Sequence, residues 1–337
     1  NATAAGNLNV TGNIDVDGTT DLDGLTVAGN LSVDGGTIKL DGNYPTGSNN
    51  VALGDQALDD GSLSGNANTA IGYQALSENE GGGSSVAVGS GSLYSNTSAS
   101  NNTALGKDAL YANTTGAQNV AVGHTALDAN TTGGSNTAVG ASALSANTTS
   151  DYNAALGWAA LKAQTTGVRN TGVGAFALNQ NTTGGRNTAL GYAALYTYNV
   201  TDDGLDYNTA IGYSALGSNT TGANNTAVGG LSLNTNTTGD RNSGFGYQSL
   251  YSNTTGERNT GAGNLSLYNN TTGIRNVGVG NQALYGNTTG QYNTAVGYAC
   301  LGNNTTAENN TGLGYNALGS NTTGTENVAV GKGALDA

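Results

Sequence analysis

Residues 293–309 read NTAVGYACLGNNTTAEN, and the next stretch, 310–326, reads NTGLGYNALGSNTTGTE. Both stretches carry Asn, Gly, Leu and Asn-Thr-Thr at the same places, and a fixed period of this kind indicates a repeat architecture. Counted from the Asn of NTAVG, seventeen such units follow one another from residue 50. Their period is 17 residues, except for 18 residues in the first unit and 21 in the unit that begins at Asn187. The additional residues near 198–207 predict a surface loop.

Each position of the unit, with the Asn of NTAVG as position 1, has a structural interpretation. Positions 2–4 predict a short strand whose large residue at position 4, such as Val296, faces inward. Position 5 is Gly in every unit, as at Gly297, and predicts a sharp bend or a positive φ. The following segment favours one helical turn over a second strand, with an inward Leu at position 9, such as Leu301. Asn-Thr-Thr-Gly then closes the unit as a turn.

A unit with only two large inward residues cannot form a core alone, whereas stacked copies can. The sequence therefore predicts an all-β fold, a parallel β-solenoid of 17-residue coils over residues 50–337. Asn at position 1, such as Asn293, predicts a ladder in which each side-chain amide bonds the amides above and below it. Asn at position 12 predicts a second ladder of the same kind.

Residues 1–43 contain a different repeat, with Gly about every six residues and apolar residues alternating with polar ones. This pattern predicts short strands joined by tight turns, in a strip that needs identical chains to pair with. Residues 44–49 form a linker and contain the only Pro. Calcium is the one cofactor suggested, by the carboxylates of Asp15, Asp17, Asp21 and Asp23, although the polar face of alternating strands explains these residues as well.

Composition excludes several classes of function. The formal net charge of −13 excludes nucleic acid and anionic lipid headgroups as partners, because binding phosphates requires clustered Lys and Arg. No run of about 18 apolar residues occurs, so membrane insertion is not expected. The single histidine, His124, stands at a variable surface position, and no repeated constellation of His, Cys or Ser accompanies it. The sequence thus predicts that the protein is not an enzyme.

The single cysteine, Cys300, occupies position 8, where the other units have Ala or Ser. Since only small residues occur there, we expect a buried spacer beside Leu301 rather than a reactive thiol.

Three further columns of residues are candidate sites. Position 17 places Arg241, Arg258 and Arg275 on consecutive coils, as a solvated turn or as a stripe that binds acidic glycans. Position 10 places Tyr251, Tyr268 and Tyr285 on consecutive coils, as packing between coils or as an aromatic strip that stacks on sugar rings. The Asn-Thr-Thr sites match the pattern for N-glycosylation, although turn geometry also explains them; they include Asn113, Asn130, Asn253 and Asn287.

An array of the type NTAVGYQALYSNTTG, preceded by GNLNVTGNIDVDGTTDLDGLTVAGNLSVDG, resembles phage tail-fibre proteins, many of which end in an endosialidase-type intramolecular chaperone. The NTAVG element is also similar to coils in the heads of trimeric autotransporter adhesins, whose unit is shorter. This resemblance implies a homotrimeric fibre at the surface of a virion or cell, outside the cell. It also implies a chaperone that is cleaved off after trimerisation.

The favoured function is that of a non-enzymatic extracellular fibre or adhesin shaft that presents a surface to a glycan or other receptor. The main alternative is a self-assembling extracellular filament or matrix protein, whose open ends or N-terminal strip polymerise. A minor alternative is an ice-binding solenoid with ranked Thr at position 2. The alternation of Thr with Val at that position counts against it.

Overall fold

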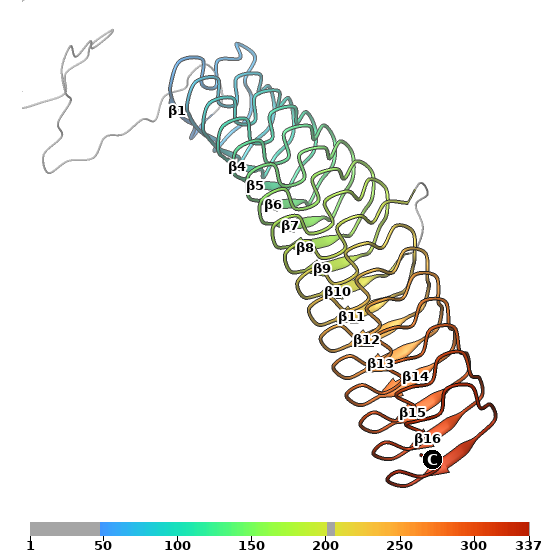
Figure 1. Cartoon of the computed structure of the whole chain (residues 1–337). Coiled ribbons are helices and arrows are strands. Elements are labelled where there is room, and N and C mark those ends of the chain that lie inside the picture. Colours follow the sequence, from blue (N-terminus) through green and yellow to red (C-terminus); the bar gives the residue numbers. More distant parts are fainter. Residues whose placement is uncertain (1–47, 201–205, 337) are drawn as a thin grey trace, which may run out of the picture. The chain divides into compact units, whose positions relative to one another are not determined.

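The computed structural model describes residues 48–200 and 206–336, and they form a β-solenoid (Figure 1). Each repeat contributes one strand of three residues, and consecutive strands pair in parallel within one 17-stranded sheet. The all-β solenoid prediction is confirmed, and these two ranges contain no helix. The strands are β1 (Val51–Leu53), β2 (Thr69–Ile71), β3 (Val86–Val88), β4 (Thr103–Leu105), β5 (Val120–Val122), β6 (Thr137–Val139), β7 (Ala154–Leu156), β8 (Thr171–Val173), β9 (Thr188–Leu190), β10 (Thr209–Ile211), β11 (Thr226–Val228), β12 (Ser243–Phe245), β13 (Thr260–Ala262), β14 (Val277–Val279), β15 (Thr294–Val296), β16 (Thr311–Leu313) and β17 (Val328–Val330).

The register of the sheet follows the repeat, because each residue pairs with the residue at the same position of the next unit. In β15 and β16, for example, Thr294 pairs with Thr311. The long unit keeps this register, since Thr188 of β9 pairs with Thr209 of β10. Residues 201–205 of the predicted loop, the N-terminal strip 1–43 and most of the linker lie outside the described residues.

The strand turns its smallest residue inward, which contradicts the prediction for position 4. Ala295 at position 3 of β15 is fully buried, whereas its neighbours Thr294 and Val296 are only partly buried. Successive side chains of a strand point to opposite faces, so positions 2 and 4 share the outer face. Position 3 must be small because it meets the opposite wall of the coil directly. The core consists mainly of Ala from positions 3 and 8 with Leu from position 9, joined by Leu63, Tyr198, Val200 and Cys300.

The leucine at position 9 is fully buried in most coils, as at Leu301, and its backbone is left-handed. All seventeen of these leucines have positive φ, and Leu301 has a φ of 51°. The residue at position 7 is also left-handed, as at Ala299 with a φ of 49°. The predicted helical turn is therefore wrong, because a right-handed helix cannot hold two such residues. The segment is a stacked corner in which the N–H of Leu301 donates to the carbonyl of Ala317 in the next coil, at 3.0 Å.

The invariant glycine at position 5 is required for two reasons. Gly297 has a φ of 135°, a conformation that side chains rarely adopt. A Cβ on Gly297 would also lie 2.3 Å from the carbonyl oxygen of Gly314 in the next coil. The column of glycines thus lets consecutive coils approach at the bend, as the sequence predicted.

The two asparagine columns bond in different ways. At position 12, Nδ2 of Asn270 donates to Oδ1 of Asn253 at 2.8 Å and receives the same bond at its own Oδ1 from Asn287. This column is the predicted amide ladder. At position 1, Oδ1 of Asn293 instead accepts from the backbone N–H of Asn310 at 3.0 Å. The predicted continuous amide ladder is wrong there, because side-chain amides bond one another only in isolated pairs, as in Asn187 with Asn170 and Asn327 with Asn310.

Both asparagines of one coil converge on one carbonyl. The oxygen of Gly273, at position 15, accepts from Nδ2 of Asn259 at 2.8 Å and from Nδ2 of Asn270 at 3.1 Å. All three groups are buried, and buried polar groups need partners. The turn of each coil is therefore fastened from inside by amides rather than by apolar packing.

Positions 8 and 3 of adjacent coils compensate one another in size in several coils, although Ser92 faces Ala104 and Ala160 faces Gly172. Where position 8 is Ala283, the facing residue of the next coil is Ala295. Where position 8 is Cys300, the facing residue is Gly312, and a Cβ there would lie 2.5 Å from Sγ. The same relation holds for three serines, whose Oγ atoms would lie 2.5–2.7 Å from such a Cβ; the pairs are Ser232 with Gly244, Ser249 with Gly261, and Ser266 with Gly278.

We expect Gly312→Ala to lower the free energy of unfolding by about 1–3 kcal/mol, because the added methyl overpacks against Sγ of Cys300. The double variant Cys300→Ala with Gly312→Ala recreates the natural pair of Ala283 and Ala295 and should recover most of this loss. A double-mutant cycle in chemical denaturation measures the coupling. Additive effects of the two substitutions would contradict the size compensation.

We expect Asn270→Ala to lower the free energy of local opening by about 1–3 kcal/mol, since it leaves Oδ1 of Asn253 buried without its donor. Hydrogen exchange of the amides in the coils that begin at Asn259 and Asn276 measures the effect. Thr272→Ala, on the exposed turn of the same coil, is the matched control and should change little. Equal loss of protection in both variants would refute the role of the ladder.

Candidate functional site

Cys300 lies where the size argument placed it. Its side chain is fully buried beside Leu301, and burial raises the pKa of the thiol, with a smaller opposing effect from a backbone hydrogen bond involving Val296. A buried thiol with a raised pKa supplies little thiolate, so it is a poor nucleophile and a poor metal ligand at neutral pH. The geometry supports a spacer.

Cys300 should therefore resist a thiol reagent such as 5,5′-dithiobis(2-nitrobenzoic acid) at pH values near 8 while the chain is folded. The same reagent should modify one thiol per chain once guanidinium has unfolded the solenoid. Absorbance of the released thiolate measures both. Fast stoichiometric modification of the folded chain would show that the thiol is accessible after all.

The arginine column is exposed and ends in a tyrosine. Arg241, Arg258 and Arg275 all have positive φ, and each donates its backbone N–H to the preceding coil. The guanidinium of Arg275 lies 5.3 Å from the ring centroid of Tyr292 and donates to its Oη at 2.6 Å. This cation–π contact holds the guanidinium of Arg275 along the surface.

The tyrosines at position 10 stack on one another. The rings of Tyr251 and Tyr268, and those of Tyr268 and Tyr285, have centroids 5.3 Å apart and are inclined by 7°. Tyr94 and Tyr111 form a second stack with centroids 5.0 Å apart. An inner ring such as Tyr268 is therefore covered on both faces by its neighbours, and free ring faces are left at the ends of a stack.

A hollow lies beyond the C-terminal ring of each stack. One, of about 330 Å³, is lined by Asp108, Tyr111, Thr125 and Asp128. The other, of about 140 Å³, is lined by Tyr285 and Gly302, with Gln282, Ala299, Asn303, Asn316 and Gly319. In each case the hollow begins where position 10 changes from Tyr to another residue, Asp128 or Gly302. The sequence reasoning missed these hollows, although this change along the column would have located them.

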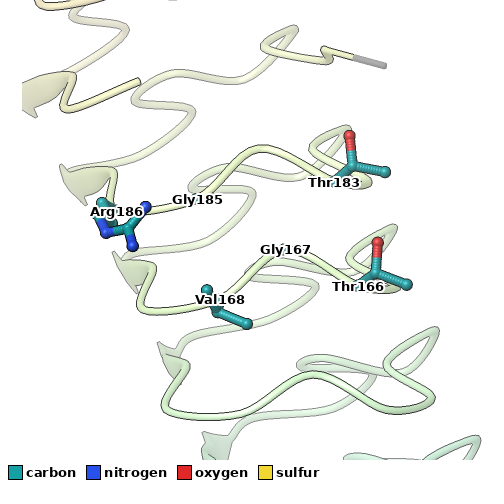
Figure 2. Close-up of a pocket in the computed structure, with 6 residues that line it drawn as sticks. All are labelled: Thr166, Gly167, Val168, Thr183, Gly185 and Arg186. Carbon is teal, nitrogen blue, oxygen red and sulfur yellow. The ribbon is translucent and has the colours of Figure 1, made fainter. Parts of the chain in front are cut away.

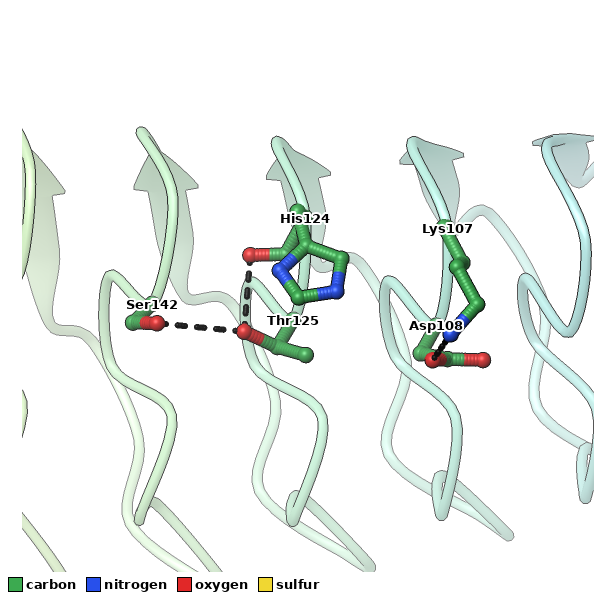
Figure 3. A network of polar contacts seen from close by, with 5 residues as sticks. All are labelled: Lys107, Asp108, His124, Thr125 and Ser142. Atoms are coloured by element: carbon green, nitrogen blue, oxygen red, sulfur yellow. Dashed lines mark hydrogen bonds and ion pairs between the residues drawn. The ribbon is translucent and has the colours of Figure 1, made fainter.

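The hollow beside Tyr111 has a polar rim from positions 6 and 7. Figure 3 shows Asp108, Thr125 and Ser142 in a row on successive coils. Nζ of Lys107 lies 3.0 Å from Oδ2 of Asp108, and the hydroxyls of Thr125 and Ser142 lie 3.1 Å apart. His124 is exposed beside this row. These contacts fix the side chains that border the hollow.

Asp128 is the residue of this rim whose carboxylate lacks a hydrogen bond at one oxygen. Its Oδ1 is shielded from solvent and has no hydrogen-bond partner. Burial raises the pKa of the carboxyl, and nearby Asp108 adds to the rise, while backbone N–H groups of Asp128 and Ala129 and the neighbouring His124 oppose it. The site can therefore accept a hydrogen bond that the chain itself does not supply.

A further hollow of about 180 Å³ lies between two neighbouring turns (Figure 2). It is lined by Thr166, Gly167 and Val168 of one coil and by Thr183, Gly185 and Arg186 of the next. The guanidinium of Arg186 lies 5.9 Å from the ring centroid of Tyr207. This hollow is part of the groove between neighbouring turns. Apart from Arg186, no acidic, basic or aromatic residue is among those that line it.

The Asn-Thr-Thr asparagines are interior residues. Asn113, Asn130, Asn253 and Asn287 are fully buried, and Nδ2 of Asn253, for example, donates to Oδ1 of Asn236 at 2.7 Å and to the carbonyl of Gly256 at 2.9 Å. The nitrogen that would carry a sugar is thus engaged inside the coil. A folded coil leaves no room for a glycan at these positions, so the glycosylation interpretation is not retained.

The calcium candidates Asp15, Asp17, Asp21 and Asp23 lie outside the described residues. Among the residues that the structure does describe, no group of three or more His, Cys, Asp or Glu side chains is placed to hold a metal ion. In the same part of the chain no helix has the length and apolar character needed to cross a membrane.

The outer face of the sheet is an uncharged surface along the solenoid. Positions 2 and 4 of all seventeen strands point outward, and none of the strand residues is charged. Several large side chains are well exposed there, including Leu105 at 47% and Leu156 at 48%. A row of exposed apolar side chains at position 4, beside the mostly Thr row at position 2, is typical of an interaction surface. Sequence reasoning missed it because it placed the residues of position 4 inside.

Comparison of the chain with models of protein families, with curated proteins and with solved structures gives no match. The resemblance to tail fibres and adhesin heads therefore depends on the quoted repeat motifs alone.

Proposed function

We propose that the protein is the shaft of an extracellular fibre or adhesin, without enzymatic activity, that carries a receptor-binding surface on a virion or cell. The observation that supports this most is the unbroken sheet of 17 strands, in which each strand pairs only with its neighbours. Such a one-dimensional array gains stiffness from its ladders and repeats its surface positions at a constant spacing.

Identical chains are the partners that we propose for the uncharged outer face, in a homotrimer. With strands roughly 4.8 Å apart and three residues of about 3.3 Å each, the face covers on the order of 750 Å². That area is close to the roughly 800 Å² that one partner buries in a standard two-chain interface, and in a trimer it is divided between two neighbours. A repeated Thr or Val beside a repeated Leu, Val or Ile gives each chain the same ridges, which favours self-association.

The proposal is tested by electron microscopy and light scattering of the purified chain, with charges placed on the sheet face. Wild-type protein should form discrete trimeric rods, and Val228→Lys with Val296→Lys should yield monomers, because two buried charges per chain would be left unpaired. Thr238→Lys with Thr306→Lys, on the exposed turn of the same coils, is the matched control and should remain trimeric.

Other outcomes of that experiment would contradict the proposal. Indefinite filaments of uniform subunit repeat would favour the self-assembling matrix protein instead. Wild-type monomers, or trimers that survive Val228→Lys with Val296→Lys, would show that the sheet face is not the interface. The ice-binding alternative gains no support from the outward position 2, because Val interrupts its row of Thr hydroxyls.

A further inference from the structure

We propose that the two hollows at the ends of the tyrosine stacks bind neutral saccharides, each taking one sugar ring. This inference deepens the proposed function and rests on it for its biological role, since it names the class of ligand that a receptor-binding shaft would meet. It stands on three features that both hollows share: an open ring face, hydrogen-bonding side chains at the rim, and space where a large residue is missing.

The first shared feature is a tyrosine ring with one face open. Tyr111 is 40% exposed, and the next coil presents Asp128 in place of another tyrosine, so the ring has no stacking partner on that side. Beyond Tyr285, position 10 is Gly302 and then Gly319, which leaves two coils without a side chain there. The apolar C–H face of a pyranose ring can pack on such a tyrosine and replace the missing ring of the stack.

The rim of the hollow beside Tyr111 favours a ligand that donates a hydrogen bond and carries no negative charge. Oδ1 of Asp128 is shielded and unbonded, and a buried acceptor without a donor costs free energy until one arrives. A sugar hydroxyl can supply that donor once the carboxyl of Asp128, which lines the hollow, turns toward it. A carboxylate-bearing sugar is disfavoured here, because Asp108 and Asp128 both line the hollow and the chain has a net charge of −13.

The rim of the second hollow distinguishes a sugar from an ammonium ion. Gln282, Asn303 and Asn316 contribute amides, which both donate and accept, and no carboxylate is among the residues that line this hollow. No carboxylate among the lining residues could pair with a cation, although Asp336 accepts from Nδ2 of Asn316 beside the hollow. Hydroxyl groups can bond to both amides and carboxylates. The ligand that suits both rims is therefore an uncharged ring with several hydroxyls.

The two hollows use the same columns, positions 7 and 10, and lie ten units apart. At about 4.8 Å per coil this separation is roughly 48 Å. A polysaccharide of repeated sequence could occupy both at once, and three chains side by side would multiply the contacts. Weak single sites then suffice for firm attachment, because linked binding events raise the effective concentration.

Saturation-transfer NMR on the full chain tests the inference, with maltotriose, cellotriose, triacetylchitotriose and lactose as neutral probes and 3′-sialyllactose as the charged counterpart of lactose. We expect transfer to the ring protons of at least one neutral probe. Tyr111→Ala combined with Tyr285→Ala should weaken that binding by roughly fivefold or more, as expected for loss of an aromatic contact. Tyr247→Ala, an exposed tyrosine that lines neither hollow, is the matched control and should bind as wild type does.

Three results would overturn the inference: no transfer to any neutral probe, equal affinity of the double variant and Tyr247→Ala, or tighter binding of 3′-sialyllactose than of lactose. Thermal melting followed by circular dichroism checks that both variants remain folded. Light scattering of the same samples reports the oligomeric state separately. Trimers that bind no saccharide would therefore refute these sites while leaving the proposed shaft intact.

Discussion

Stacking of one coil on the next is the constraint on which the rest of this fold depends. A coil makes few hydrogen bonds to itself, and most of its backbone groups pair with the coil above or below. The cost of a left-handed leucine, about 1–2 kcal/mol in isolation, is tolerated at position 9 because its N–H meets a carbonyl of the next coil at about 3.0 Å, as at Leu301. Strain of this kind persists where the surroundings determine the backbone.

The same constraint explains which parts of the fold were predictable from the sequence. The period, the strand at positions 2–4 and the glycine at position 5 follow from local preferences that the fold also uses, and Gly297 is an example. The left-handed backbone of Leu301 could not be predicted, because no leucine prefers it and only the neighbouring coils impose it. Val296 was placed inside for a related reason: a large apolar residue is normally buried, but here the thin coil has room only for Ala295.

The candidate sites show a similar division. The stacking of Tyr251, Tyr268 and Tyr285 follows from their shared position, since equal positions of successive coils are neighbours. The hollow beyond Tyr285 depends instead on the residue that ends the stack, Gly302. The missing hydrogen-bond partner at Asp128 depends on the burial of Oδ1, which spacing in the sequence does not reveal. Columns of identical residues build the solenoid, and the places where a column changes give it local chemistry.

The ladder at position 12 also gives the solenoid a polarity. Where its amides bond one another, each donates toward the preceding coil, as Asn270 does to Asn253, so the side-chain dipoles point the same way and add along the column. Their positive ends face the N-terminal coils, and their negative ends face the C-terminal ones. Tyr198 takes the place of asparagine in the long unit and leaves Oδ1 of Asn181 unbonded, which interrupts the summed dipole at that coil. Each uninterrupted length of this solenoid is therefore electrically directional, with unlike ends.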